Sequence, residues 1–196
     1  MKIGIDIDEI VTEYMKSFLE FLETEKGICV DYNSITEYLN PCQSEGMKRE
    51  HVKQFVQEHT EKEYTLLELD IVDGSLNAID FLDKNHEICF ITSRHISNKE
   101  KTHHFFKKHF PNNEFKIFFS GDCWEGSKTK AEICIEESCS ILIEDNPDYA
   151  FDCAKKGIKV FLLGKPWNKD YEKHENIIKV QNWNEILKYL EKENGR

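Results

Sequence analysis

Oxygen-bearing side chains follow three short apolar runs of this chain, each at the point where the run ends. Asp6 and Asp8 come after residues 3–5, Thr92 and Ser93 after residues 88–91, and Glu144 and Asp145 after residues 141–143. Side chains at the carboxyl ends of buried parallel strands converge in one crevice. Carboxylates gathered there could hold a hard cation, and hydroxyl and backbone N–H groups could hold an anion.

Asp6 and Asp8 are two residues apart, and residues i and i+2 of a strand point to the same side. Both carboxylates can therefore face one cavity. One could bind a cation or attack phosphorus, and the other could donate and accept a proton. For this pair taken alone, a surface turn with two solvated acids remains the alternative.

The hydroxyl pair and two lysines could supply binding groups for an anion. Thr92 and Ser93 suit that use, although a turn or a helix cap is commoner for such a pair. If Ser127 caps a helix over residues 127–138, Lys128 and Lys130 both lie in its first turn. The helix dipole disfavours a cation there by about 0.3–1 kcal/mol, which points mildly to function. A solvated lysine is the preferred interpretation of Lys128.

Two adjacent acids, Glu144 and Asp145, end an apolar run, and this arrangement is costly without a partner. Buried together they would repel and raise each other's pKa, and a divalent cation would remove that cost. Capping of a helix at Pro147 explains Asn146 well. It explains the two acids poorly.

Strands and helices alternate along the chain, which predicts βαβ units and an α/β fold. The predicted strands are nearly continuous apolar runs, as expected when helices cover both faces of a parallel sheet. We therefore expect a Rossmann-like, doubly wound parallel sheet. The predicted strands cover 2–7, 87–91, 115–119, 140–143 and 159–163, and the predicted helices cover 75–82, 98–109, 127–138, a segment from Pro147, and a segment after the N-cap signature Asn182-x-x-Glu185.

The segment after the first predicted strand has a different character. Its apolar residues from 11 to 22 have helical spacing, and residues 26–70 are polar with a weak helical stripe near Phe55. We expect a small helical insertion here. Its aromatic residues could stack on a base, although aromatic residues at helical spacing are more often core; they are Tyr14, Phe18, Tyr32 and Tyr38.

The bulk composition narrows the possible partners and locations. The 196 residues carry a formal net charge of −11, which argues against binding of long nucleic acid but permits a small phosphorylated substrate. No apolar run reaches the length of about 20 residues that spans a bilayer, and the acids near the start are unlike a secretory signal. Seven cysteines without a C-x-x-C pair predict reduced, mostly buried thiols. We expect a cytoplasmic protein that does not bind membranes.

Taken together and in order, the motifs resemble those of the haloacid dehalogenase-like hydrolase superfamily. That family has D-x-D after a first strand, Ser or Thr after a second, a lysine near a helix start, and an acidic pair after a later strand. The segments IGIDIDEIV, FITSR, KAEIC and LIEDNPDYA are similar to the 5′(3′)-deoxyribonucleotidase branch. The resemblance implies an α/β core over 1–15 and 73–196 and a helical cap over 16–72.

The resemblance also implies a role for each motif residue and Mg²⁺ as the cofactor. Asp6 would be the nucleophile that forms an aspartyl-phosphate, and Asp8 the general acid and base. Thr92 and Ser93 with Lys130 would bind phosphate. The metal ligands would be Asp6, the Asp8 main-chain carbonyl and Asp145, with Glu144 in support. One departure is Glu9, which stands where many relatives have glycine.

The implied activity is that of a Mg²⁺-dependent phosphomonoesterase on nucleoside monophosphates. A phosphatase for another small phosphate, such as a sugar phosphate or a phosphoryl end group, is the first alternative. A non-catalytic phosphate-binding or receiver-like domain is the second. The D-x-D on the first strand and the late acidic pair argue against a receiver domain.

Overall fold

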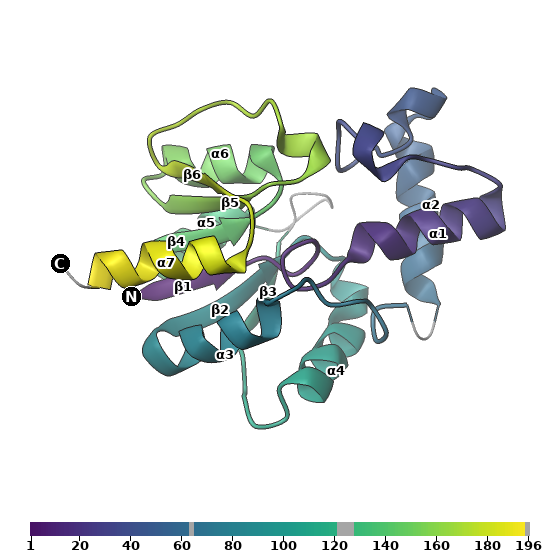
Figure 1. Cartoon of the computed structure of the whole chain (residues 1–196). Coiled ribbons are helices and arrows are strands. Elements are labelled where there is room, and N and C mark those ends of the chain that lie inside the picture. The colour runs from purple at the N-terminus through teal and green to yellow at the C-terminus, as the bar shows by residue number, and fades with distance from the viewer. Residues whose placement is uncertain (63–64, 121–127, 195–196) are drawn as a thin grey trace.

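Six parallel strands form one sheet in the computed structural model, which describes residues 1–62, 65–120 and 128–194 (Figure 1). The strand order is β3-β2-β1-β4-β5-β6. The strands are β1 (Lys2–Ile5), β2 (Glu87–Thr92), β3 (Ile117–Phe119), β4 (Ile141–Glu144), β5 (Lys159–Leu163) and β6 (Ile177–Val180). The predicted doubly wound α/β fold is confirmed. β6 was not predicted from the sequence; it is a short edge strand whose middle residues are only partly buried.

Helices cover both faces of this sheet. One face packs against α3 (Ser75–Asn85), α4 (Lys99–His109) and α7 (Trp183–Asn194), and the other against α5 (Lys130–Glu136) and α6 (Pro147–Lys155). Successive strand residues alternate between the two hydrophobic cores, since Ile3 and Ile5 face the first. Gly4 lies between them, where an added Cβ would come 3.0 Å from the Ile91 side chain. The nearly continuous apolar strands are thus explained by burial on both faces.

The polar strand ends meet because all the strands run the same way. Asp6 directly follows β1, Thr92 ends β2 and Glu144 ends β4, while β2 and β4 flank β1. The chain leaves β1 for β2 on one side and later returns to β4 on the other. Ligands of open α/β sheets bind at such a switch point.

The segment between β1 and α3 is mainly helical and lies beyond the carboxyl end of the sheet (Figure 1). It contains α1 (Tyr14–Lys26), α2 (Arg49–Glu61), η1 (Tyr32–Ser34) and η2 (Gln43–Glu45). Its entry and exit run antiparallel, because Thr12 pairs with Ile71. Its apolar residues form a third hydrophobic cluster, which one residue from outside the segment, Trp167, completes.

Two boundaries differ from the sequence expectation. The helix expected from residue 11 begins at Tyr14, because the backbone turns at Glu9, whose φ is 63°. The helix expected over 127–138 is α5, which begins at Lys130. Thr129 caps it through a capping box with Glu132. The expected cap Ser127 lies outside the described residues.

Within the described residues, each helix is too short or too polar to cross a membrane. The described cysteines are free, and all but Cys29 are buried. Cys123 lies outside the described residues.

Candidate functional site

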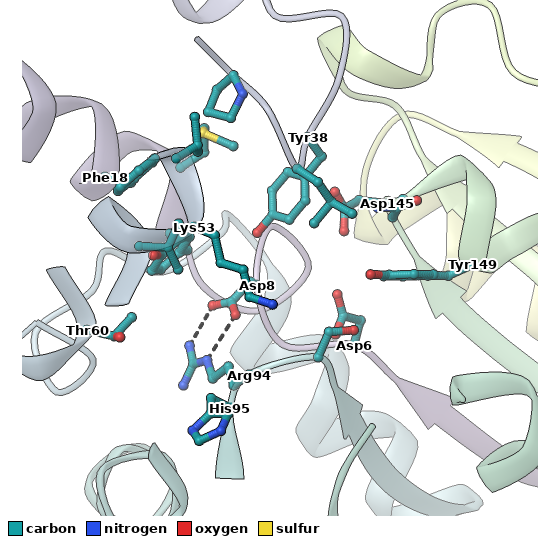
Figure 2. Close-up of a pocket in the computed structure, with 18 of the residues that line it drawn as sticks. Asp6, Asp8, Phe18, Tyr38, Lys53, Thr60, Arg94, His95, Asp145 and Tyr149 are labelled. Carbon is teal, nitrogen blue, oxygen red and sulfur yellow. Dashed lines mark hydrogen bonds and ion pairs between the residues drawn. The ribbon is translucent and has the colours of Figure 1, made fainter. Parts of the chain in front are cut away.

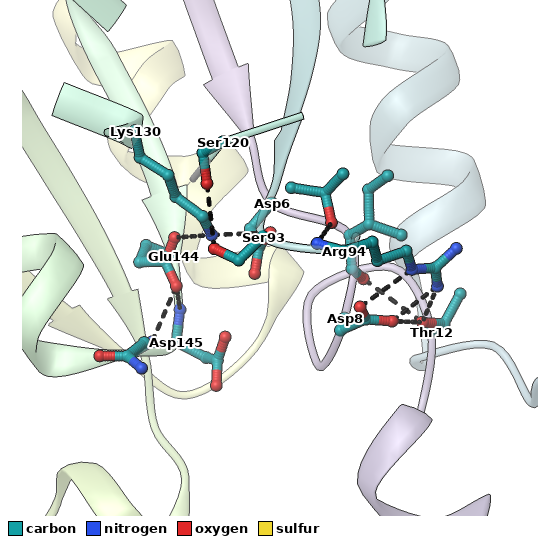
Figure 3. A network of polar contacts seen from close by, with 12 residues as sticks. Asp6, Asp8, Thr12, Ser93, Arg94, Ser120, Lys130, Glu144 and Asp145 are labelled. Atoms are coloured by element: carbon teal, nitrogen blue, oxygen red, sulfur yellow. Dashed lines mark hydrogen bonds and ion pairs between the residues drawn. The ribbon is translucent and has the colours of Figure 1, made fainter. Parts of the chain in front are cut away.

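Asp6 lies in a buried group of charges at the carboxyl end of the sheet (Figure 3). Lys130 Nζ is 2.8 Å from Asp6 Oδ1 and 2.8 Å from Glu144 Oε2. Its side chain is 2% exposed, and those of its two partners are 8% and 0% exposed. One ammonium group thus joins the first and the last acidic motif.

Burial shifts the charge balance of this group. It raises the pKa of Asp6 to about 8; Lys130 opposes the rise, and Glu144 and Asp8 add to it. Burial also raises the pKa of Asp145 well above its usual range, and the carboxylates of Glu144 and Asp6 add to that rise. Ionising all three acids would place more negative charge here than Lys130 alone balances, so a bound cation would favour their ionised forms.

The two candidate lysines are in different environments. Lys130 is the first residue of α5. It reaches into the carboxylate group, that is, the buried side chains of Asp6, Glu144 and Asp145. Lys128 precedes the helix and pairs with Glu136 on the surface, at 2.6 Å with both side chains more than half exposed. The expectation that both lie in the first helical turn is wrong, because the helix starts two residues after Lys128. Only Lys130 of these two is in position to contact Asp6.

The Asp8 side chain is bound by Arg94 and lies apart from the carboxylate group. Arg94 donates from Nε to Asp8 Oδ2 at 2.9 Å and from an Nη atom to Asp8 Oδ1 at 2.6 Å (Figure 3). Thr12 donates to Asp8 Oδ1 at 3.1 Å, and the far side of the guanidinium contacts Thr102. A bidentate guanidinium contact of this kind fixes the orientation of a carboxylate.

The two hydroxyl residues after β2 are placed differently. Thr92 is buried, and its Oγ1 accepts a hydrogen bond from the Arg94 backbone N–H at 3.2 Å. Ser93 lines the cavity that also contains Asp6, and its Oγ is 3.2 Å from Ser120 Oγ. Ser93 is therefore the hydroxyl of this pair that faces the cavity, while Thr92 orders the turn that leads to Arg94.

The acidic pair after β4 has its own set of partners. Glu144 Oε1 accepts hydrogen bonds from the backbone N–H groups of Asp145 and Asn146. Asp145 Oδ2 accepts one from Trp167 Nε1 at 2.9 Å. Asn146 caps α6, whose first residue is Pro147. The cap predicted for this helix thus coexists with the acidic pair.

A divalent cation fits the carboxylate group. Asp6, Glu144 and Asp145 each offer an oxygen within 4.8 Å of the other two, and all three residues are buried. Hard cations such as Mg²⁺ prefer oxygen ligands of this kind. The side chain of Asp8 lies outside this group and contacts Arg94. The family resemblance assigns only the main-chain carbonyl of Asp8 to the metal.

One cavity lies between the sheet and the helical segment (Figure 2). The carboxylate group, Lys130, Ser93 and Arg94 all line it. Its floor includes Asp6, Asp8 and Asp145, and its far wall is mostly apolar. In Figure 2 the Lys53 side chain extends from the helical segment toward Asp8. Of the four aromatic candidates, Tyr14, Phe18 and Tyr38 line this cavity, whereas Tyr32 lines a separate one beside Glu9.

Glu9 replaces the expected glycine and adopts the left-handed conformation that glycine would favour. Its Oε1 accepts a hydrogen bond from Met15 N at 2.6 Å, which satisfies the first turn of α1. Its Oε2 lies 3.0 Å from Lys165 Nζ. The side chain thus compensates for the backbone strain by holding the start of the helical segment against the core.

Three residues of the site were not predicted from the sequence: Arg94 as the partner of Asp8, Trp167 and Lys165. Arg94 had a visible signal, since it follows the hydroxyl pair directly. Trp167 had none, because it lies in a short helical turn after β5, 22 residues from Asp145.

No protein-family model matches the sequence. Two curated nucleotidases are similar along most of the chain. "Putative nucleotidase YqfW" of Bacillus subtilis is 23% identical over 191 residues, covering 97% of this chain and 93% of that protein. A nucleotidase of Clostridium acetobutylicum is 26% identical over 193 residues, covering 95% and 91%.

Two solved structures share the fold. A haloacid dehalogenase-like family hydrolase from Streptococcus pneumoniae superposes with a TM-score of 0.67 at 14% identity, covering 96% of this chain and 97% of that one. The "putative HAD-hydrolase YfnB" of Bacillus subtilis, bound to magnesium, superposes with a TM-score of 0.61 at 15% identity, covering 96% of this chain and 97% of that one. The predicted resemblance to haloacid dehalogenase-like hydrolases, with nucleotidases among the similar sequences, is confirmed.

Proposed function

We propose that this chain, which has the fold of the haloacid dehalogenase-like hydrolases, is a Mg²⁺-dependent phosphomonoesterase acting on nucleoside monophosphates. One observation carries the proposal. The carboxylate of Asp6 sits in a buried group with Lys130 and two further acids, on the floor of a cavity that Asp8 also lines. A nucleophile, a cation site and a second carboxyl group for proton transfer are thus available around one cavity.

In the first step, an Asp6 oxygen attacks the substrate phosphorus and the ester P–O bond breaks, leaving an aspartyl-phosphate. Asp8 delivers a proton to the departing alcohol oxygen. Within the described residues, Arg94 and Thr12 occupy three of the roughly four acceptor positions of the Asp8 carboxyl group, and the remaining position would carry the proton that is transferred. In the second step, Asp8 takes a proton from water, which attacks phosphorus and releases Asp6.

The remaining motif residues position and neutralise the phosphoryl group. Lys130 stabilises negative charge on Asp6 and on phosphate, and Ser93 contributes a hydroxyl at the cavity wall. Thr92 supports the turn that presents Ser93 and Arg94. When bound by Asp6 and Asp145 with Glu144 beside them, Mg²⁺ supplies Lewis-acid stabilisation of the phosphoryl oxygens.

The helical segment 16–72 is proposed as the cap that selects the leaving group. Tyr14, Phe18 and Tyr38 bring aromatic rings to the cavity wall opposite the carboxylates. Such a wall suits an aromatic base better than a small polyol. The names of the two similar nucleotidases support the same substrate class.

A phosphate-release screen tests this function. The full-length protein is incubated with nucleoside monophosphates, sugar phosphates and nucleoside diphosphates, each with Mg²⁺ and with EDTA. We expect release from nucleoside monophosphates only with Mg²⁺. Preferential release from sugar phosphates would support phosphatase activity but refute nucleoside monophosphates as the substrate class. If no compound releases phosphate, the proposed phosphomonoesterase activity is refuted.

Asp6→Asn tests the chemistry. The amide is nearly isosteric but a far weaker nucleophile, so turnover should fall to background while the fold persists. A variant that keeps near-normal turnover would refute the role of Asp6. Asp80→Asn is the matched control, because this aspartate pairs on the surface with Lys84.

A further inference from the structure

Trp167 connects the carboxylate group to the helical segment. It belongs to η4 (Pro166–Asn168), which follows β5 in the core part of the chain. Its indole Nε1 donates to Asp145 Oδ2 at 2.9 Å in a buried contact. Its neighbour Asn168 donates from Nδ2 to the Asp145 backbone oxygen at 2.7 Å. Both the side chain and the main chain of Asp145 are thus held from this short helix.

The other side of the indole packs into the helical segment. The ring centroid of Trp167 is 5.1 Å from that of Tyr38 and 5.8 Å from that of Tyr32, in a tilted and an edge-on contact. Among the described residues, Trp167 is the only buried member of this hydrophobic cluster from outside residues 14–69. Its side chain is therefore held by the helical segment while its polar atom is bound to a core carboxylate.

The hydrogen bond restricts how Asp145 can bind a cation. Oδ2 accepts the indole N–H, and the Asp145 carboxylate has an oxygen within 4.8 Å of oxygens of Asp6 and Glu144. A donor that fixes one oxygen orients the other, and such outer partners of metal ligands typically contribute about 10- to 100-fold in metal affinity.

We infer that Trp167 is a positioning residue for the metal site: its indole N–H orients Asp145 for cation binding, and Tyr38 and Tyr32 hold the indole in place. The inference rests on the proposed function for the identity of the cation. It adds that the helical segment, beyond contacting substrate, determines how well the core binds metal. Tyr38 lines the substrate cavity and touches Trp167, so one residue serves both tasks.

Trp167→Phe tests the hydrogen bond, because it removes the N–H and keeps an aromatic ring. The chain offers a matched control in Trp183, whose Nε1 also donates at 2.9 Å in a buried contact, but to the Ile10 backbone oxygen. EDTA-stripped proteins are titrated with MgCl₂ alone by calorimetry, and the Mg²⁺-induced rise in Tm is recorded in parallel. We expect Mg²⁺ affinity to fall about 10- to 100-fold in W167F and to stay within about threefold in W183F.

Tyr38→Leu tests the aromatic support without touching the hydrogen bond. Loss of a ring contact of this type should weaken Mg²⁺ binding by about three- to tenfold. Phe18→Leu is its control, since Phe18 lines the same cavity but its ring contacts Tyr14, Phe21 and His59. Mg²⁺ affinity should not change in F18L.

The outcomes separate this inference from the proposed function. Unchanged Mg²⁺ affinity in a folded W167F would overturn the inference. If the wild type still released phosphate in a Mg²⁺-dependent manner, the proposed function would stand. Equal losses in W167F and W183F would also overturn it, because the effect would then be general destabilisation. A wild type that neither binds Mg²⁺ nor releases phosphate would overturn both. If W167F does not fold, the Y38L and F18L pair decides.

Discussion

Replacing Lys130 by methionine tests whether the buried charge group holds the site together. Methionine is unbranched and about as long as the aliphatic part of lysine, but it lacks the ammonium that lies 2.8 Å from both Asp6 and Glu144. Removing one partner of a buried, nearly unexposed ion pair typically costs about 3–5 kcal/mol, because the remaining charge stays buried without compensation. We expect the free energy of unfolding of K130M to fall by about that amount.

Lys128→Met is the control for the same chemical change two residues away. Lys128 pairs with Glu136 at 2.6 Å, with exposed fractions of 59% and 53%. Exposed pairs contribute about 0–1 kcal/mol, so K128M should lose less than about 1 kcal/mol. Both variants and the wild type are unfolded with urea in EDTA at 25 °C, monitored by far-UV circular dichroism.

The loss in K130M should also depend on pH. In the intact protein burial raises the pKa of Asp6 to about 8, against the opposing effect of Lys130. Without Lys130 that pKa rises further, so above about pH 8 the variant holds a proton that the wild type has released. Stability then falls more steeply with pH in the variant. The difference should widen from pH 7 to pH 9; equal losses in K130M and K128M, or a difference that narrows, would refute this account.

Three further predictions concern the neighbouring contacts. Arg94→Lys keeps the charge but loses the bidentate contact to Asp8, so kcat should fall roughly 100-fold; unchanged kcat in a steady-state assay would contradict this. Burial lowers the pKa of His59 to about 4, so the unfolded chain binds a proton that the native state lacks between about pH 4 and 6.5, and stability falls on acidification. His59→Gln should flatten that slope by up to about 1.4 kcal/mol per pH unit in urea titrations, and an unchanged slope would argue against it. Because protons compete with metal at Asp6, whose pKa is raised to about 8, the Tm gain on adding Mg²⁺ should grow from pH 6 to pH 9; a gain independent of pH would exclude that competition.

Local pattern in the sequence was enough to predict the sheet and most of its polar strand ends. Buried parallel strands have nearly continuous apolar sequences, and the residue after each apolar run lies at the carboxyl edge of the sheet. Asp6, Glu144 and Asp145 could therefore be expected to meet, and their oxygens do lie together. The edge strand β6 was not predicted, because it is only four residues long and Lys179, one of its two partly buried middle residues, interrupts its apolar run.

The tertiary structure decided which partner each of these groups has. Arg94 contacts Asp8 across 86 residues of sequence, and Trp167 contacts Asp145 from a loop after β5. Periodicity reports only which face a residue occupies, whereas a side-chain partner depends on how distant elements pack. The sequence alone thus determined that acids gather at one edge of a parallel sheet. Only the packing of the helical segment and the β5–β6 loop against that edge determined which carboxylate meets an arginine, a lysine or an indole, because those contacts join residues that no local pattern links.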